Sequence, residues 1–291
     1  MRYPLTGLRL RFWIPAVMLG SLLAACGAPT TTIYVVSSDM HTIHAYTSAG
    51  VQMGPTIVVP TQIQGIAVDA SGKIYVTGFD NTVTTYTAAG ARTTPTITGL
   101  HGPIGIVVDP GGKIYVANLD DNTVTTYAPD GTPTTPTITG VMNPMGLALD
   151  GAGKIYVADF VDNAITAYTS DGVKSTPALT GLNGPGAFAA DAKGNIYVAD
   201  GPLETLEVYN ADGTQTPALT PPKVSNAAGV AIDDTGKIYV ISTPNSGPST
   251  LTTYNADGTP STPTIAALPG KITYKIDKST NGTSTPIIAV H

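Results

Sequence analysis

Short clusters of carboxylate and amide side chains recur along the chain, and these are the residue types best suited to binding chemistry. They are Asp39 and His41; Asp80 and Asn81; Asp120, Asp121 and Asn122; Asp159, Asp162 and Asn163; and Asp200 and Glu204. Oxygen atoms that converge from several loops can hold Ca²⁺ or a polyol. Alternatively, Asp and Asn close tight loops by bonding to the backbone. Because the clusters recur in nearly every repeat, we favour loop closure, assign no metal or other cofactor, and treat the clusters as a candidate ligand-binding face.

The residues that usually carry catalysis do not form a recognisable set. Both glutamates, Glu204 and Glu207, lie in one repeat, and no Ser, Cys or Lys sits beside a plausible base. The histidines are scattered and are expected at the surface: His41, His44, His101 and His291. We therefore name no catalytic residue; a non-enzymatic role is favoured, although the sequence leaves the question of an enzyme open.

Two further patterns have competing interpretations. Four Asp-Gly pairs resemble fragments of calcium loops, but they lack alternating acidic residues and are predicted to be hairpin turns that need φ > 0: Asp130-Gly131, Asp171-Gly172, Asp212-Gly213 and Asp257-Gly258. A second set consists of Leu100, Met142, Met145 and Leu182. These apolar side chains either line a groove or pack between repeats, and we favour packing.

The elements that position these residues come from an internal repeat. An Ile-Tyr-Val triplet places tyrosines at Tyr34, Tyr75, Tyr115, Tyr156, Tyr197 and Tyr239, in steps of 41, 40, 41, 41 and 42 residues. A period of about 40 residues is typical of propeller blades. Each repeat predicts four short strands, called a to d here: a Gly- and Ala-rich strand a, an apolar strand b, a Thr-rich and half-buried strand c, and an edge strand d that contains proline.

These features predict an all-β fold, a six-bladed β-propeller with four-stranded blades. The chain enters at strand b, Ile33–Val36, so the first blade needs an inner strand from the C-terminal part. Spacing from Pro263 assigns that role to Ile272–Asp277, and pairing of the N- and C-terminal strands closes the ring. Pro286–Val290 then reads as a surplus strand that either displaces Ile33–Val36 or adds to an edge. In such a propeller the d-to-a and b-to-c connections share one face, so the polar clusters should gather there.

The segment before the repeats has a different character. Residues 1–25 combine a basic start with an apolar stretch and are predicted to be a cleaved signal peptide. Leu23-Ala24-Ala25-Cys26 resembles the lipobox of bacterial lipoproteins, which implies lipidation of Cys26, a short tether over 26–32 and a propeller over 33–291. We expect an envelope protein anchored to the bilayer, at the outer membrane in a Gram-negative host.

Charge restricts the partners of the mature chain. Without Arg2, Arg9 and Arg11 the chain carries 11 basic and 20 acidic side chains, a net charge of −9. Such a surface repels phosphate backbones, so a nucleic-acid partner is not expected. We expect a monomer whose partner is a protein, a glycan or a small ligand.

The succession of Gly-Ile-Ala-Val-Asp, Gly-Lys-Ile-Tyr-Val and an Asn before a Val-x-x-Tyr strand resembles the NHL repeat over residues 33–277. The resemblance implies a propeller fold but not one function, since NHL-like propellers include binding modules, a lyase and relatives of metal-dependent gluconolactonases. Our first hypothesis is an envelope-anchored binding or scaffold module that uses the loop face. The alternative is a metal-dependent hydrolase or lyase of the gluconolactonase-like or NHL-lyase type.

Overall fold

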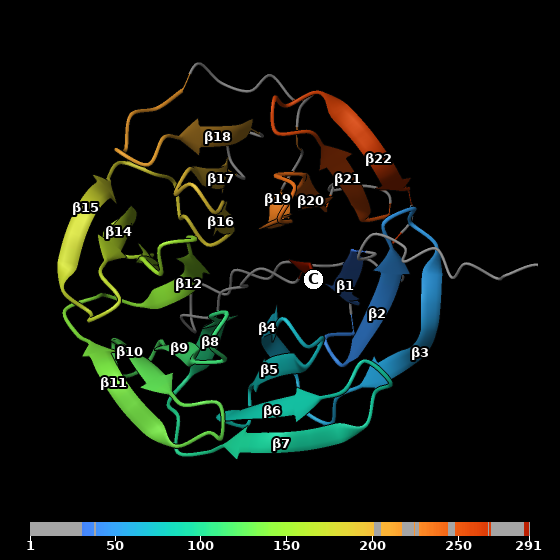
Figure 1. Ribbon diagram of the computed structural model, residues 1–291, viewed down its shortest axis with the longest axis horizontal. Coiled ribbons are helices and arrows are strands. Elements are labelled where there is room, and N and C mark those ends of the chain that lie inside the picture. The colour runs from blue at the N-terminus through green and yellow to red at the C-terminus, as the bar shows by residue number, and fades with distance from the viewer. Residues whose placement is uncertain are drawn as a thin grey trace, which may run out of the picture. The chain divides into compact units, whose positions relative to one another are not determined.

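Six antiparallel sheets surround a central axis in the computed structural model (Figure 1). The structure describes residues 31–37, 39–200, 205–216, 224, 227–243, 248–266, 268 and 288–290, and all six sheets belong to the unit that spans Thr31–His291. Every described element is a strand, and no helix long and apolar enough to cross a bilayer occurs among these residues. The predicted all-β, six-bladed propeller is confirmed.

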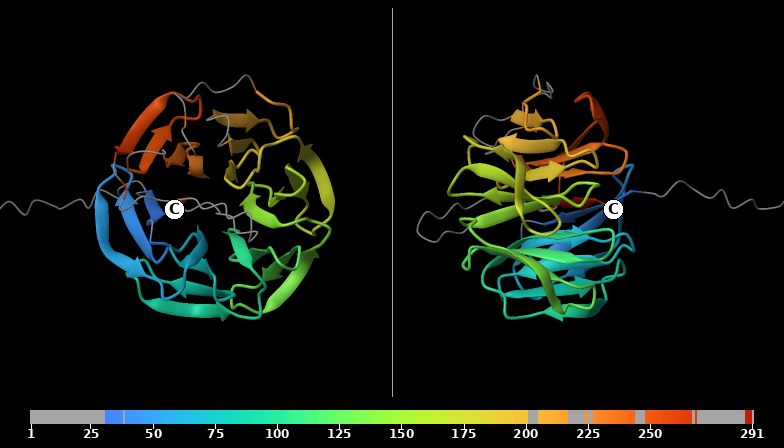
Figure 2. Two further views of the ribbon diagram at one scale, coloured as in Figure 1. Left: turned by 180° about the vertical axis from the view of Figure 1, so that it is seen from behind. Right: turned by 60° about the vertical axis from the view of Figure 1, so that its left-hand side comes forward.

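In each blade the strands lie side by side in order from the axis outward. Figure 2 shows the same ring from behind and obliquely. In the order of blades 1 to 6 they are β23 (Ile288–Val290), β1 (Thr32–Val36), β2 (Thr42–Thr47) and β3 (Gln52–Val58); β4 (Ile63–Val68), β5 (Ile74–Gly78), β6 (Thr82–Tyr86) and β7 (Arg92–Ile97); β8 (Pro103–Val108), β9 (Ile114–Asn118), β10 (Thr123–Tyr127) and β11 (Pro133–Ile138); β12 (Pro144–Leu149), β13 (Ile155–Asp159), β14 (Ala164–Tyr168) and β15 (Lys174–Leu179); β16 (Phe188–Ala190), β17 (Ile196–Asp200) and β18 (Thr205–Tyr209); and β19 (Ala227–Ile232), β20 (Ile238–Ser242), β21 (Thr250–Tyr254) and β22 (Pro260–Ile265). In blade 5 the described residues supply three strands, and Pro217, where the fourth was predicted, lies outside them.

The ring closes through the two ends of the chain, but not with the predicted segment. The strand that occupies the inner edge of β1 is β23, with Ile33 opposite Val290 and Tyr34 opposite Ala289. The assignment of Ile272–Asp277 to this place was wrong, because β1 has one free inner edge and β23 already pairs with it. Residues 272–277 themselves lie outside the described part of the chain. The apparently surplus strand is therefore the one that completes blade 1.

Small residues on the inner strands allow the blades to converge. A Cβ atom on Gly65 of β4 would lie 2.3 Å from the carbonyl oxygen of Ile104 in β8, and one on Gly105 would lie 2.5 Å from that of Met145 in β12. Each glycine thus lies directly against the backbone of the next blade. This confirms the role predicted for Gly in strand a.

The second strand of each blade forms the core between neighbouring blades. Tyr75, Tyr156 and Tyr239 are at most 1% exposed, and their hydroxyl groups donate to Asp69, Asp150 and Asp233 at 2.9, 3.1 and 2.8 Å. These aspartates occupy the turn between strands a and b. The turn that starts strand b is therefore tied to the middle of the buried layer.

The third strand is half-buried in blades 3 and 6, as predicted, since Thr125 and Thr252 are partly exposed. Other threonines of the strand are fully buried: Thr85, Thr126 and Thr253 are at most 2% exposed and donate to the carbonyl oxygens of Pro95, Pro136 and Pro263. A buried threonine hydroxyl is tolerated because a carbonyl of the outer strand satisfies it.

The outer strands interlock from blade to blade. A Cβ atom on Gly131, in the c-to-d turn of blade 3, would lie 2.6 Å from Cβ of Pro95 in blade 2. Gly50 of blade 1 meets Pro263 of blade 6 in the same way at 2.7 Å, so the outer layer also closes the ring. The Asp-Gly pairs are turns as predicted, with φ between +78° and +86° at Gly131, Gly172, Gly213 and Gly258.

Candidate functional site

Connections between antiparallel strands alternate between the two ends of each sheet, which gives the propeller two unlike faces. We call the face with the d-to-a and b-to-c connections the loop face and the face with the a-to-b and c-to-d turns the turn face. The predicted polar clusters fall on the loop face, except where they lie outside the described residues. Glu204 and Cys26 lie outside them, as do the signal peptide and nearly all of the tether. Asp200 ends β17, and its side chain is likewise not described.

In blade 1 the cluster closes its own loop. The carboxylate of Asp39 accepts hydrogen bonds from the backbone N–H groups of His41 at 2.8 Å and Thr42 at 3.0 Å, and from the hydroxyls of Ser37 and Thr42. Burial raises the pKa of Asp39, but these hydrogen bonds outweigh it and hold the pKa well below its ordinary value. This is the loop-closing role expected for Asp.

The amides tie neighbouring blades together. Asn81, Asn122 and Asn163 all have positive φ, between 48° and 63°. Their Oδ1 atoms accept hydrogen bonds from the backbone N–H groups of Gly102, Asn143 and Gly184, at 3.0, 2.8 and 3.0 Å. Each acceptor lies on a b-to-c loop, and each donor lies on the connection that enters the next blade. Asn is suited to this place because it tolerates left-handed geometry and its side chain accepts from a neighbouring loop.

Backbone hydrogen bonds link the b-to-c loop of each of these blades to the d-to-a connection that enters the same blade. The N–H of Phe79 donates to Gln62 O at 2.9 Å, that of Leu119 to Gly102 O at 2.9 Å and that of Phe160 to Asn143 O at 3.4 Å. Bonds within a blade therefore alternate with the Asn bonds between blades. We call the loops that they join across blades 2 to 4, residues 79–81, 101–102, 119–122, 142–143 and 160–163, the loop arc.

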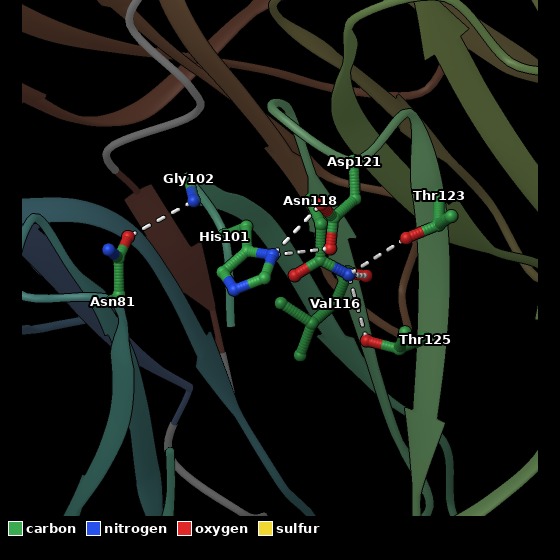
Figure 3. A network of polar contacts seen from close by, with 8 residues as sticks. All are labelled: Asn81, His101, Gly102, Val116, Asn118, Asp121, Thr123 and Thr125. Carbon is green, nitrogen blue, oxygen red and sulfur yellow. Dashed lines mark hydrogen bonds and ion pairs between the residues drawn. The ribbon is translucent and has the colours of Figure 1, made fainter. Parts of the chain in front are cut away.

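The last residue of strand b differs from blade to blade beneath this arc. In blade 4 it is Asp159, which is 5% exposed and accepts the N–H groups of Met142 at 2.7 Å and Asp162 at 3.1 Å. In blade 3 it is Asn118, 1% exposed, whose Nδ2 donates to the hydroxyls of Thr125 at 2.9 Å and Thr123 at 3.3 Å (Figure 3). Its Oδ1 has no partner among the described residues.

His101 is the one histidine that the arc pairs with a carboxylate. Its Nδ1 lies 2.9 Å from both oxygens of Asp121, and the side chains are 62% and 47% exposed (Figure 3). Exposed pairs of this kind contribute about 0–1 kcal/mol to stability. Sequence reasoning placed His101 at the surface, which is confirmed, but it did not pair it with Asp121, since 20 residues separate them.

The arc also exposes side chains that loop closure does not use. Asp80, Asp120, Asp121 and Asp162 are exposed, although Asp80 accepts the hydroxyl of Thr82 at 2.8 Å. Beside them, Phe79 is 73%, Met142 47% and Val161 52% exposed. The prediction that the apolar set packs between blades is confirmed for Leu100, Met145 and Leu182, which are at most 7% exposed, and wrong for Met142. Phe79 and Val161 were not singled out from sequence, because single apolar residues in loops carry no signal of exposure.

Metal ligands are the remaining question for this face. Within the described residues, no group of three or more His, Cys, Asp or Glu side chains is arranged to hold a metal ion. The carboxylates of the arc are spread along it, and Asp39 and Asp159 each already accept two backbone N–H groups.

Comparison with known proteins identifies the class of fold but not a family or a function. Searches of protein-family models and of curated proteins find no match. Among solved structures, a protein of unknown function from Bacteroides caccae has a TM-score of 0.65 at 14% identity and covers 90% of this chain and 98% of its own. A nidogen/laminin complex has a TM-score of 0.68 at 18% identity, with the same coverage. Virginiamycin B lyase from Staphylococcus aureus has a TM-score of 0.59 at 14% identity and covers 79% of each chain. Identities this low establish the six-bladed propeller fold alone.

Proposed function

We propose that this protein is a binding module that presents its loop face to a partner. The observation that carries the proposal is the exposure of Phe79, Met142 and Val161 on one face, among the exposed carboxylates of Asp80, Asp120, Asp121 and Asp162. Apolar side chains gathered at a surface and rimmed by polar residues are typical of interaction sites. The turn face offers a contrast, since there the same Asp–Tyr hydrogen bond recurs in successive blades.

Photo-crosslinking in the native cell envelope tests this proposal. A benzophenone amino acid placed at Phe79 or Val161 should give adducts of discrete mass, whereas the same group at Val173 should not. Val173 is the matched control, because it is apolar and 63% exposed but lies in a turn of the opposite face. Equal labelling from both faces, or none from either, would overturn the proposal.

The alternative is a hydrolase or lyase at the same face, and the His101–Asp121 pair is the observation in its favour. A carboxylate that holds Nδ1 orients an imidazole for proton transfer. Metal titration separates the two functions. We expect protein stripped of metal to show no rise in Tm on addition of micromolar Ca²⁺ or Zn²⁺. A large rise would favour a metal-dependent enzyme.

We further propose that the propeller is anchored to the envelope by lipid on Cys26. The support is the residue pattern around Cys26, which resembles a lipobox. Mass spectrometry should find a lipid-modified N-terminal Cys26, and Cys26→Ser should release the protein from the membrane fraction. An unmodified cysteine in membrane-bound protein would contradict this.

A further inference from the structure

Among the described residues, Lys and Arg side chains lie at one face only, whereas aspartates occur on both faces. All seven described Lys and Arg residues lie at the turn-face end of the blades: Lys73, Arg92, Lys113, Lys154, Lys174, Lys193 and Lys237. Four of these lysines are held there, since Lys73, Lys113, Lys154 and Lys237 donate to carbonyl oxygens of the outer strands at 2.8 to 3.5 Å. The loop arc contains four exposed aspartates and no Lys or Arg. Its field therefore favours a cationic partner.

Two aromatic side chains that follow strand b in the arc, Phe79 and Phe160, differ in their surroundings. In blade 4, Phe160 lies over Gly184, where a Cβ atom would be 3.0 Å from its ring. At the corresponding Gly102 the carboxylate of Asp120 takes that place, 2.8 Å from the same point, and Phe79 is 73% exposed. The carboxylate of Asp120 thus occupies, at Gly102, the place that the ring of Phe160 takes at Gly184, and the ring of Phe79 is exposed. The arc therefore presents both anionic and aromatic groups at its surface.

The arc is also held in shape before any partner binds. Hydrogen bonds of 2.8 to 3.4 Å link its loops without interruption from Phe79 to Asn163. A surface that is already ordered loses little conformational entropy on binding, which increases affinity. Asp120 and Asp121 therefore stand at fixed positions between Phe79 on one side and Met142 and Val161 on the other.

We propose that the loop arc binds a basic polypeptide segment in which apolar residues alternate with lysine or arginine. This inference rests on the proposed function and specifies its partner. Exposed apolar residues at the blade 2 and blade 4 ends of an arc that spans three blades fit an extended chain better than a single ion, and the carboxylates between them complement its charges. A nucleic acid would meet the same carboxylates as a repulsive surface.

Binding of synthetic peptides tests the partner class directly. The probe is a fluorescein-labelled dodecapeptide with the repeat Lys-Leu-Lys-Ser, and fluorescence anisotropy with the full chain measures Kd at low and moderate salt. Two further peptides carry Glu in place of Lys, or Ser in place of Leu. We expect the lysine-leucine peptide to bind most tightly, the serine version about tenfold more weakly, and the glutamate version not at all.

Matched variants locate the site. Asp80→Asn with Asp162→Asn removes two charges from the arc and should raise Kd about tenfold, with a weaker salt dependence. Asp171→Asn with Asp234→Asn removes two exposed charges from the turn face and should change Kd less than about twofold. Phe79→Ser should weaken binding about fivefold, whereas Val173→Ser should not.

The outcomes separate this inference from the proposed function. Equal binding of the lysine and glutamate peptides, or equal effects of the two double variants, would overturn the assignment of a basic partner. If adducts still form from Phe79 in the envelope and are insensitive to Asp80→Asn with Asp162→Asn, the loop face binds a partner of another chemistry. If no adducts form, the proposed function fails with it.

Discussion

The two faces of this propeller are built from the same repeat but show different degrees of regularity. On the turn face, successive blades repeat the Asp–Tyr bond, the Lys–carbonyl bond and the turn glycine against a neighbouring proline. On the loop face the Asn bond between blades and the backbone bond within each blade repeat, but the side chains around them vary. Where side chains repeat, they serve the fold that all blades share. Where they differ, as at Phe79, Asp120 and Met142, the repeat does not prescribe them, and these positions are the ones on which the proposed binding function rests.

The largest expected effect is a loss of folding stability, and it is tested by comparing one glycine from each face. Gly131→Ala should destabilise the protein by about 3 kcal/mol, because left-handed geometry and the clash with Pro95 add together. Gly140→Ala, on the loop face, has a similar φ of 75° but no atom within 4 Å of the added Cβ. It should cost about 1 kcal/mol, from backbone strain alone. Urea denaturation measures both, and equal losses would show that the turn glycines do not interlock the blades.

The next effect concerns the tyrosines beneath the turn face. Burial, together with the nearby Asp109 carboxylate, raises the pKa of Tyr115 to about 12. A pKa raised on folding stabilises the protein fully below about pH 10, the value for unfolded chains, and this contribution is lost as pH rises through about 12. Tyr115→Phe should therefore be about 1 kcal/mol less stable at pH 8.

The pH profile distinguishes this from simple loss of a hydrogen bond. The difference in stability between wild type and Tyr115→Phe should shrink between pH 10 and pH 12, as chemical denaturation at each pH would show. A loop-face variant, Asn122→Gly, should keep the wild-type slope over this range. Parallel curves for wild type and Tyr115→Phe would contradict the link between this tyrosine and alkaline stability.

A further pair of variants isolates the regular part of the loop face. Asn122→Gly keeps the left-handed backbone but loses the bond to Asn143 N–H, and should cost about 1 kcal/mol. Asn122→Ala loses the bond and adds backbone strain, so it should cost about 1 kcal/mol more. Thermal denaturation of the pair measures the difference. If both variants matched wild type, the amide bonds between blades would not contribute to ring stability.

Much of the fold was predictable because the same sequence pattern recurs in six consecutive repeats. The tyrosine period, the Gly-rich inner strands and the Asp-Gly turns all describe local requirements that recur, and each is confirmed by the structure. We predicted correctly that strands from the two ends of the chain pair to close the ring, but we assigned the C-terminal strand to the wrong segment. Spacing from Pro263 favoured Ile272–Asp277, whereas β23 pairs with β1. A spacing rule learned within the array does not hold at its end, where one strand must join two distant parts of the chain.

The amino-acid sequence by itself determined the class of fold, the blade number and the loops on which polar residues gather. Only the tertiary structure decided which of those residues are used up by the fold and which are free. Asn122 and Asp159 are engaged because loops distant in sequence bring N–H groups to them, and Phe79 is exposed while Asp120 lies against Gly102. Local propensities act over a few residues, whereas these outcomes depend on contacts between loops 17 to 21 residues apart, which only the folded blades bring together.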